Sequence, residues 1–371
     1  MPTQPILGIL GGGQLAQMLA LAAIPLGISC HIYEPDPHAP ARLCAVHHCA
    51  TYDDFTALQA FADAVDVITY EFENVPVACV AFLAARKPVA PGAMALRICQ
   101  DRLLEKEFAT QLGYATAPFI ALSDALSSTD AVAAVGLPAI LKTRRMGYDG
   151  KGQQTIHSTA ELDAARAHYI GHELILEGYV PFTYEVSIIA ARDQFGTIIR
   201  YPLVQNMHRD GILRRSTAPA PCSTAALEAN AHLMSSRILS AFAYVGILTI
   251  ECFVIDTPHG PTLVINEFAP RVHNSGHWSI EGSSTSQFEN HVRAVTGLAV
   301  REPIMRGVAV MLNLIGNEPE DSAVPAGVAI HRYHKTPRPG RKVGHLTVVA
   351  PHNSDCSVLV EACTNLPGTY V

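Results

Sequence analysis

Residues 6–23 read ILGILGGGQLAQMLALAA, and this stretch decides how the chain begins to fold. The apolar run at 6–10 predicts a short buried strand, the glycines at 11–13 predict a tight turn, and apolar periodicity over 14–23 predicts a helix. The same patterns predict the next elements, namely strands at 28–34 and 65–70 and a helix at 55–64. This order of elements is typical of parallel α/β structure. We therefore expect residues 1–95 to form a doubly wound, Rossmann-like domain with a parallel sheet.

The glycine turn at 11–13 is also compatible with a dinucleotide site. Its glycines do not fit the G-x-G-x-x-G spacing, however, and Glu34, which closes the second predicted strand, is followed by Pro-Asp-Pro. The backbone N–H groups of such a turn suit an anion at a helix N-terminus, although an ordinary tight turn explains the glycines as well. A nicotinamide-dependent oxidoreductase is therefore an alternative that rests on this turn alone.

The middle of the chain is predicted to be α+β and its end to be β-rich. Helices are expected at 101–112, 160–170 and 225–243, and strands at 137–142, 174–177, 185–192, 198–204, 246–255 and 262–267. After residue 300, prolines and glycines alternate with short β-rich runs such as 309–314 and 345–349. We expect three domains, at 1–95, 96–300 and 301–371.

The composition excludes several classes of protein. Of the 371 residues, 49% are hydrophobic and only 16% are charged, which is too apolar for a disordered chain. The net charge of −7 argues against a nucleic-acid-binding surface. The nine cysteines contain no C-x-x-C pair, so neither a zinc ribbon nor a disulfide framework is indicated. No apolar run is long enough for a membrane span. We expect a cytoplasmic protein without nucleic-acid or membrane partners.

A basic, glycine-rich loop follows one of the predicted strands. Residues 142–153, KTRRMGYDGKGQ, contain two lysines, two arginines and three glycines. Glycines let the backbone close over phosphates, and Lys142 at the end of the strand would supply a point charge for them. A solvated basic loop is the alternative explanation. Further on, a strand ending in Glu177-Gly178 would offer backbone groups to an adenine edge, and Glu185 would accept hydrogen bonds from ribose hydroxyls.

Two carboxylates lie in apolar strands, where an unpaired charge is costly. Glu251 lies in GILTIECFVI and Glu267 in LVINEFAPR. A magnesium ion that bridges nucleotide phosphates would satisfy both, because a hard cation takes one or two carboxylates together with phosphate oxygens. The alternative is that each glutamate is held by an arginine, for which Arg271 is close in sequence.

Two further segments are rich in polar and basic groups. The loop from Arg271 to Trp278, RVHNSGHW, is rich in donors and not periodic, which is typical of a binding loop. The segment 332–342 carries five lysines or arginines in eleven residues of a chain whose net charge is −7. That concentration indicates a local anion, in particular a phosphate monoester, with a solvated cationic turn as the alternative.

Together these motifs resemble the N5-carboxyaminoimidazole ribonucleotide synthetase family of the ATP-grasp superfamily. The likeness runs from about Ile6 to His345. It is carried by GILGGGQLAQMLALAA, YEFENVP, QDRLLEK, KTRRMGYDGKGQ, EGYV, NMHRDGIL, ECF, NEFAPRVHNSGHW and HKTPRPGRKVGH. The resemblance implies an ATP-grasp fold preceded by a Rossmann-like domain and followed by a C-terminal domain that contributes to the ribonucleotide phosphate site. It also implies a homodimer.

The resemblance further implies an ATP-dependent ligase of purine biosynthesis. Such an enzyme carboxylates 5-aminoimidazole ribonucleotide with bicarbonate through carboxyphosphate, and its cofactors are ATP and Mg²⁺. Carried over by motif, the ATP-binding residues are Arg102, Lys142, Gly147, Tyr148, Asp149, Gly150, Lys151, Gly152, Gln153, Glu177, Gly178, Tyr179, Val180, Glu185, His208, Asn266 and Glu267. The metal ligands are Glu251 and Glu267. The ribonucleotide and bicarbonate residues are Gln14, Leu15, Glu73, Tyr148, Asp149, Arg271, His273, Asn274, Lys335 and Arg341. The catalytic residues are Tyr148, Asp149, Lys151, Arg271 and His273.

The chain departs from the family pattern at two places. Family members often have Gly-Arg where this chain has Ala16-Gln17, and Gly-Gly where it has Met146-Gly147. Neither changes a charge in the expected site.

Three other functions compete with this assignment. Within the superfamily, the alternatives are a formate-dependent glycinamide ribonucleotide transformylase and a relative of biotin carboxylase. Outside enzymes, a nucleotide-binding regulator would keep the ATP residues without needing the 271–277 loop. The proton acceptor, Asp149 or the released phosphate, is left open.

Overall fold

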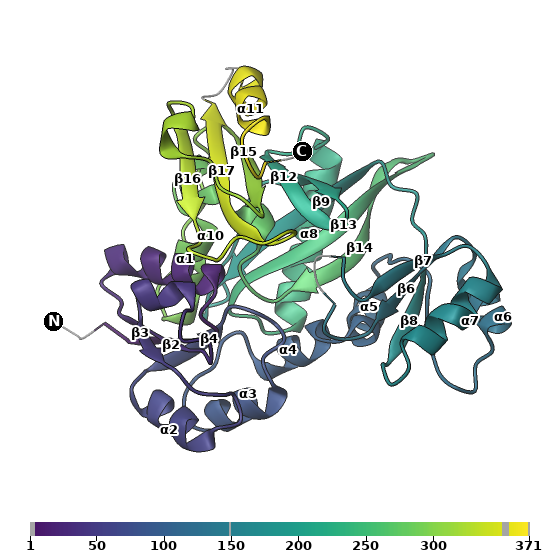
Figure 1. Ribbon diagram of the computed structural model, residues 1–371, viewed down its shortest axis with the longest axis horizontal. Coiled ribbons are helices and arrows are strands. Elements are labelled where there is room, and N and C mark those ends of the chain that lie inside the picture. The colour runs from purple at the N-terminus through teal and green to yellow at the C-terminus, as the bar shows by residue number, and fades with distance from the viewer. Residues whose placement is uncertain (1–3, 148–149, 351–355, 370–371) are drawn as a thin grey trace.

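The computed structural model describes residues 4–147, 150–350 and 356–369, and its described strands form three sheets (Figure 1). The first sheet is parallel, in the order β3-β2-β1-β4. Its strands are β1 (Leu7–Leu10), β2 (Cys30–Tyr33), β3 (Val46–His48) and β4 (Val67–Tyr70), and its helices are α1 (Gln14–Ala23), α2 (Phe55–Asp63) and α3 (Val77–Ala84). The predicted parallel α/β unit is confirmed, and β3 is an additional edge strand.

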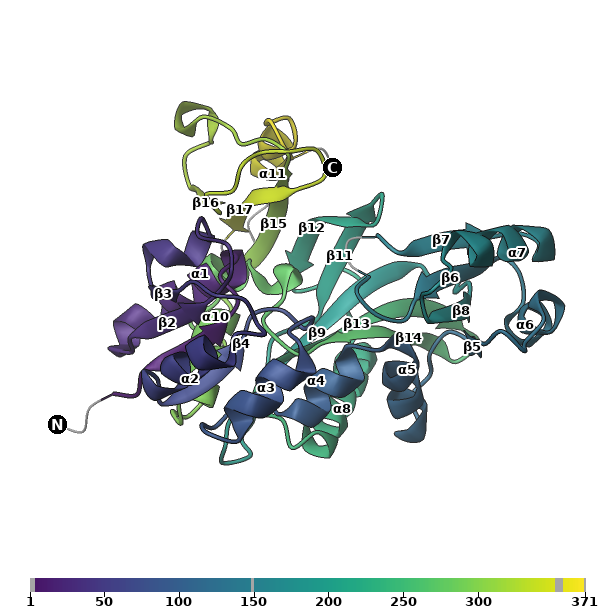
Figure 2. The ribbon, with the colours of Figure 1, turned by 60° about the horizontal axis from the view of Figure 1, so that its bottom comes forward.

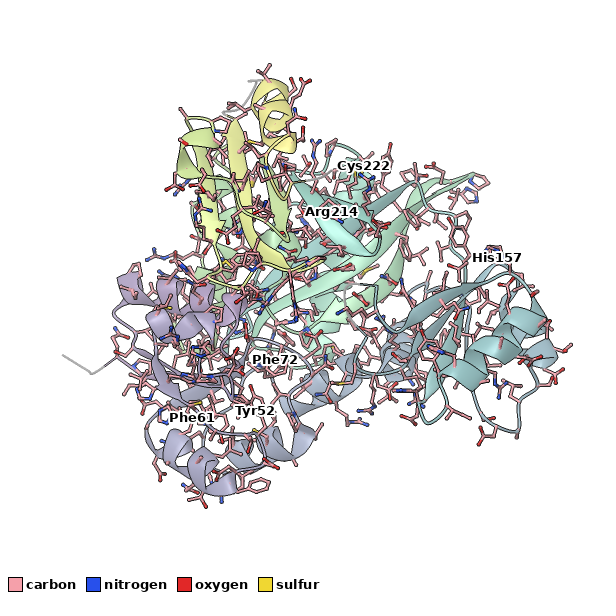
Figure 3. The ribbon with its side chains drawn as sticks, viewed as in Figure 1. Tyr52, Phe61, Phe72, His157, Arg214 and Cys222 are labelled. Atoms are coloured by element: carbon pink, nitrogen blue, oxygen red, sulfur yellow. The ribbon has the colours of Figure 1, made fainter. Side chains whose placement is uncertain are left out.

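Packing explains the sequence of β1. All four of its residues are buried, as expected for a parallel strand covered on both faces. Phe61 of α2, labelled in Figure 3, packs against this strand, and a Cβ atom at Gly8 would lie 2.8 Å from its ring. Gly8 therefore provides room for the helix to approach the sheet.

The second sheet is a small antiparallel unit in the order β5-β8-β6-β7. Its strands are β5 (Phe119–Leu122), β6 (Ala139–Thr143), β7 (Gln153–Ile156) and β8 (Leu174–Gly178), accompanied by α6 (Ser128–Val135) and α7 (Thr159–His168). It forms a separate lobe at the right of Figure 1. β6 and β7 pair as a hairpin in which Lys142 lies opposite Gln153, so the basic, glycine-rich loop is the hairpin connection.

The third sheet is antiparallel and has the main order β14-β13-β9-β11-β12-β15-β17-β16, with β10 paired to β9. Its strands are β9 (Tyr184–Arg192), β10 (Ile198–Arg200), β11 (Val204–Arg209), β12 (Ile212–Ala218), β13 (Gly246–Thr257), β14 (Gly260–Ala269), β15 (Val308–Ile315), β16 (Val328–Arg332) and β17 (Lys342–Ala350). Because β12 pairs with β15, the C-terminal strands continue the sheet of the middle region.

Helices cover this large sheet and join it to the first one. α4 (Ala93–Cys99), α5 (Arg102–Gln111) and α8 (Ala225–Ala241) lie along one face (Figure 2). α9 (Ser279–Gly282) and α10 (Gln287–Val295) follow the 271–278 loop, and α11 (Ser357–Thr364) packs on β15 and β17. One hydrophobic core includes residues of α1, α10 and the large sheet, so the first domain packs firmly on the third sheet.

Two further observations bear on the expectations from sequence. All nine cysteines are free thiols, so no disulfide framework is present. Within the described residues, none of the helices combines the length and apolar character that a crossing of the membrane requires.

Candidate active site

A cleft of about 1110 Å³ lies where the three sheets meet. The first domain contributes the ends of β1 and β4, and the small lobe contributes β6, β8 and the loop between β6 and β7. The large sheet contributes β9, β11, β13 and β14, and the 335–342 segment completes the lining. Ligand sites in α/β proteins form outside the carboxyl ends of the strands, and this cleft follows that rule for β1 and β4.

The glycine turn at the edge of the cleft is occupied by the chain's own carboxylates. Gly12 N–H donates to Glu34 Oε2 at 3.1 Å, and Ala16 N–H donates to Glu71 Oε2 at 2.9 Å. Gly13 N–H also donates to Glu71. A Cβ atom at Gly13 would lie 2.6 Å from the Glu71 carboxylate. The anion expected at this helix N-terminus is therefore a side chain, and the turn no longer supports a dinucleotide phosphate site.

A buried charge cluster lies on the side of the cleft that β6, β8 and α5 form. Glu177 Oε2 lies 3.0 Å from Lys142 Nζ and 3.1 Å from Lys106 Nζ, and all three side chains are buried. Burial alone would raise the pKa of Glu177, but Lys106, Lys142 and Arg102 outweigh it and hold that pKa at about 2. Burial lowers the pKa of Lys142. The second carboxylate oxygen of Glu177, Oε1, is buried without a hydrogen-bond partner among the described residues.

Glu185 and His208 form a second pair in the same cleft. They lie on β9 and β11, and the His208 ring and the Glu185 carboxylate are hydrogen-bonded. Burial opposes a charge on His208, but the hydrogen bond to Glu185 and the negative charge of Glu251 and Glu185 raise its pKa. His208 is thus favoured as a cation at a position that faces the cleft.

Glu251 and Glu267 lie directly opposite each other on β13 and β14, beside a β-bulge. Glu251 Oε1 is 2.8 Å from His273 Nε2, and Glu267 Oε2 is 2.8 Å from Arg102 Nη1. Burial would raise the pKa of Glu251, but His273 in particular lowers it to about 2. Arg271, which the sequence offered as a partner, instead binds Glu73. Glu267 is therefore paired with an arginine, as the alternative interpretation expected, but the arginine is Arg102 and not Arg271.

The residues around this pair are suitable for a hard cation. Asn266, next to Glu267, has a buried Oδ1 without a hydrogen-bond partner among the described residues. Two carboxylates and one carbonyl oxygen match the donors that Mg²⁺ takes in addition to phosphate oxygens. Among the described residues no cluster of three or more His, Cys, Asp or Glu side chains could hold a metal alone. A metal here would therefore need further oxygen ligands from water or from a bound anion such as a phosphate.

The opposite side of the cleft collects cations from distant parts of the chain. Arg271 donates two hydrogen bonds to Glu73. Burial would raise the pKa of Glu73, but the neighbouring Arg271 outweighs this effect and lowers that pKa. Lys335 donates to Gln14 Oε1, so the C-terminal segment contacts the glycine turn. Of the five basic residues at 332–342, Arg332 pairs outside the cleft with Glu318 at 2.9 Å and Asp321 at 2.5 Å. The other four line the cleft.

The structure brings together nearly all of the predicted site residues that it describes. Lining the cleft are Gln14, Leu15, Glu73, Arg102, Lys142, Gly147, Gly150, Lys151, Gln153, Glu177, Gly178, Tyr179, Val180, Glu185, His208, Glu251, Asn266, Glu267, Arg271, His273, Asn274, Lys335 and Arg341. Gly152 does not line it; its φ of 71° and its closeness to Thr143 show a hairpin role. Tyr148 and Asp149 lie outside the described residues.

Several residues of the site were missed from sequence. Lys106 is the clearest, since it follows Arg102 by one helical turn and both therefore share a face of α5. Glu71 and Glu105 are buried carboxylates that line the cleft. Burial raises the pKa of both groups. Arg338 and Lys342 belong to the basic segment that the sequence indicated. The sequence could not show that these two residues line the cleft whereas Arg332 does not.

Comparison with protein families divides the chain into three matching regions. Residues 5–100 match the ribonucleotide synthetase preATP-grasp domain, residues 107–288 match the ATP-grasp domain, and residues 309–357 match the phosphoribosylaminoimidazole carboxylase C-terminal domain. The order of these domains is the one that the sequence motifs implied.

Whole-chain comparisons agree with this division. The N5-carboxyaminoimidazole ribonucleotide synthase of Pseudomonas aeruginosa is 46% identical over 344 residues, covering 92% of this chain and 94% of that protein. The solved synthetase of Thermus thermophilus is 44% identical, with a TM-score of 0.91 and coverage of 97% and 98%. The Aspergillus clavatus synthase in complex with ADP and 5-aminoimidazole ribonucleotide is 27% identical, with a TM-score of 0.87 and coverage of 99% and 100%. On its motifs, cleft and relatives, this chain belongs to the N5-carboxyaminoimidazole ribonucleotide synthase family.

Proposed function

We propose that this protein uses ATP and bicarbonate to carboxylate 5-aminoimidazole ribonucleotide, giving N5-carboxyaminoimidazole ribonucleotide in de novo purine biosynthesis. The observation that carries the proposal is the position of the Glu251–Glu267 pair. Glu267 contacts Arg102 on the nucleotide side, and Glu251 contacts His273 of the 271–278 loop. The pair therefore joins two cationic halves of one cleft, as a reaction between a nucleoside triphosphate and a second phosphorylated substrate requires.

The nucleotide half would hold ATP through its charge cluster and its strand ends. Lys142 and Arg102 would face the phosphates, with the 147–153 loop closing over them. The buried, unpartnered Oε1 of Glu177 would accept a hydrogen bond from the adenine amino group. The Glu185 carboxylate would accept from ribose hydroxyls, with His208 holding its orientation.

Magnesium would be held by Glu251 and Glu267, with Asn266 beside them. When bound, the ion would spread the negative charge of the transferring phosphoryl group. On binding, Glu267 would exchange part of its contact with Arg102 for the cation. Arg102 would then be available for a phosphate oxygen.

The proposed reaction has two stages. A bicarbonate oxygen attacks the γ-phosphorus of ATP, ADP leaves, and carboxyphosphate forms; Lys142 stabilises the charge that develops on the phosphoryl oxygens. Carboxyphosphate then breaks down to carbon dioxide and phosphate within the closed cleft. The exocyclic amine of the ribonucleotide attacks the carbon dioxide and loses a proton to Asp149 or to the phosphate. Tyr148, Lys151, Arg271 and His273 would orient the bicarbonate and the amine.

The ribonucleotide would lie against the opposite half of the cleft. Lys335 and Arg341 would bind its phosphate from a turn stiffened by Pro337 and Pro339. Gln14, Leu15, Glu73 and Asn274 would contact the remainder of the ribonucleotide.

We further propose a cytoplasmic homodimer with domain limits near residues 95 and 300. The exposed apolar residues Leu21, Ile24, Leu43 and Val46, on neighbouring elements of the first domain, are compatible with a subunit interface.

An oxygen-18 experiment tests the order of steps. Bicarbonate labelled with oxygen-18 should transfer one label to the released phosphate, because the bicarbonate oxygen is the nucleophile toward phosphorus. Phosphate release should also depend on 5-aminoimidazole ribonucleotide. Unlabelled phosphate would show that water attacks ATP and would refute the mechanism. Turnover with formate and glycinamide ribonucleotide instead would favour the alternative transformylase.

A further inference from the structure

A buried chain of polar side chains lies behind the 271–278 loop and outside the cleft lining. It runs through His277, Tyr333 and His345, each with 1% or less of its surface exposed. Asn274 Nδ2 lies 3.1 Å from His277 Nδ1, which lies 3.0 Å from Tyr333 Oη, which in turn lies 2.8 Å from His345 Nδ1. We name these four residues the relay. Three of its members, all but Asn274, are absent from the cleft lining, so the proposed chemistry does not use them directly.

The hydrogen bonds of Asn274 assign the tautomer of His277. Asn274 exchanges two hydrogen bonds with Asn313, at 2.7 and 3.0 Å, so one of its amide protons and the orientation of its carboxamide are set. Its second amide proton points at His277 Nδ1, which must therefore accept. Burial lowers the pKa of both His277 and His345 well below its usual value, so both rings are neutral. His277 accordingly carries its proton on Nε2, which is buried without a hydrogen-bond partner among the described residues.

The relay also connects two regions that are far apart in sequence. Asn274 and His277 belong to the loop after β14, whereas Tyr333 directly follows β16 and lies two residues before Lys335. Tyr333 N–H donates to Val343 O at 2.8 Å, on the far side of the basic segment. At the outer end, His331 stacks on His345 with ring centres 4.5 Å apart and pairs with Glu281 at 2.6 Å.

We propose that His277 and Tyr333 are positioning residues that set the 271–278 loop against the Lys335–Arg341 segment. They act through Asn274 on one side and through the backbone next to Lys335 on the other, so they align the two protein surfaces that hold the ribonucleotide. The inference rests on the proposed function. The nucleotide residues Lys142 and Glu177 lie on β6 and β8 of a different sheet. Glu185 and His208 share the large sheet with His345, but the hydrogen bonds given above for the relay do not reach them. Loss of the relay should therefore affect the ribonucleotide and spare ATP.

Tyr333→Phe tests this role, because it removes the hydroxyl and keeps the ring. We expect a rise of about fivefold to tenfold in KM for 5-aminoimidazole ribonucleotide, the equivalent of one buried hydrogen bond. KM for ATP should remain within about twofold. The matched control is Tyr244→Phe, which also removes a buried hydroxyl, one that donates to Ile247 O at 2.7 Å. It should lower Tm by a similar amount without changing either KM.

A second pair of variants separates positioning from folding. His277→Asn places an oxygen acceptor near the position of Nδ1 and should retain most of the ribonucleotide affinity, whereas His277→Leu should lose about as much as Tyr333→Phe. Calorimetric titration of the ribonucleotide, with a non-hydrolysable ATP analogue present, measures this independently of turnover. Equal changes in both KM values, or no change in either, would overturn the positioning role. A wild-type enzyme without ribonucleotide-dependent ATP turnover would refute the proposed function, and the positioning role with it.

Discussion

Within the described part of the chain, the carboxylate of Glu267 forms an ion pair with Arg102, and its charge should be needed mainly when metal and nucleotide are bound. Glu267→Gln keeps the shape of the side chain and removes the charge. We expect kcat to fall about 100-fold or more and the magnesium concentration for half-maximal rate to rise, because transition-state charge is then less well stabilised. Steady-state kinetics over a magnesium series measures both effects.

The control for this variant is Glu318→Gln. It also breaks a glutamate–arginine pair, with Arg332 at 2.9 Å, but outside the cleft. Both pairs are half-buried, and the glutamine amide oxygen can still accept a hydrogen bond from the arginine, so both variants should remain folded. Near-normal turnover of Glu267→Gln, with an unchanged magnesium requirement, would exclude Glu267 as a metal ligand.

Individual residues also show what the sequence could not predict. The motif spacing led to Lys142, Glu177, Glu251 and Glu267, because each ends or interrupts an apolar strand. It did not reveal that the carboxylate serving the glycine turn is Glu71, 58 positions after Gly13. Such a contact depends on the pairing of β1 with β4, and no local pattern encodes the distance between two strands.

At the scale of an element, the 332–342 segment divides its cations by position. Arg341 lines the cleft, whereas Arg332 binds Glu318 and Asp321. Arg341→Ala should raise KM for 5-aminoimidazole ribonucleotide by ten- to a hundredfold, since a charge-assisted contact contributes about 1.5–3 kcal/mol. ATP affinity, measured by titration with a non-hydrolysable analogue, should stay within about threefold.

Arg332→Ala serves as the control within the same segment. It loses two ion pairs at the rim of the C-terminal strands and should leave both substrate affinities unchanged. If Arg341→Ala instead abolishes ATP binding and spares the ribonucleotide, the segment belongs to the nucleotide site and the assignment of the two halves is reversed.

The secondary-structure elements were predicted well where the pattern is strongly periodic. The expected helices at 14–23, 55–64, 101–112 and 225–243 correspond to α1, α2, α5 and α8 within two residues at each end. The expected strand at 198–204 is divided into β10 and β11, because Pro202 has no N–H to donate to a neighbouring strand. α10 was missed because it is short and contains several polar residues, although Ser286 caps its first turn; its Asn290 and His291 are buried and bind Arg301 O and Thr69 Oγ1.

For the whole molecule, the contact between the first domain and the large sheet depends on a neutral histidine. Ile247 N–H donates to His291 Nδ1 at 3.1 Å, so His291 Nε2 carries the proton and donates to Thr69 Oγ1 at 2.8 Å. A protonated ring would direct a second N–H at the Ile247 amide. Burial lowers the pKa of His291 to about 3, and it also lowers those of His31, His48, His277 and His345. Acid should therefore lower the free energy of unfolding of the whole chain.

Proton linkage predicts how the free energy of unfolding changes with pH. The unfolded chain binds a proton at each histidine near pH 6.5, whereas folded His291 does so only near pH 3. The stability that the neutral His291 ring provides is therefore complete above pH 6.5 and is lost as the pH falls toward 3. The slope for His291 alone is about 1.4 kcal/mol per pH unit. Urea unfolding at pH 8, 6 and 5 should give a steady fall in the free energy of unfolding. His291→Gln should be less stable at pH 8 but lose less on acidification, while the exposed His259→Gln should follow the wild type. A wild-type profile that is flat between pH 6.5 and 5 would show that this interface tolerates a charged histidine.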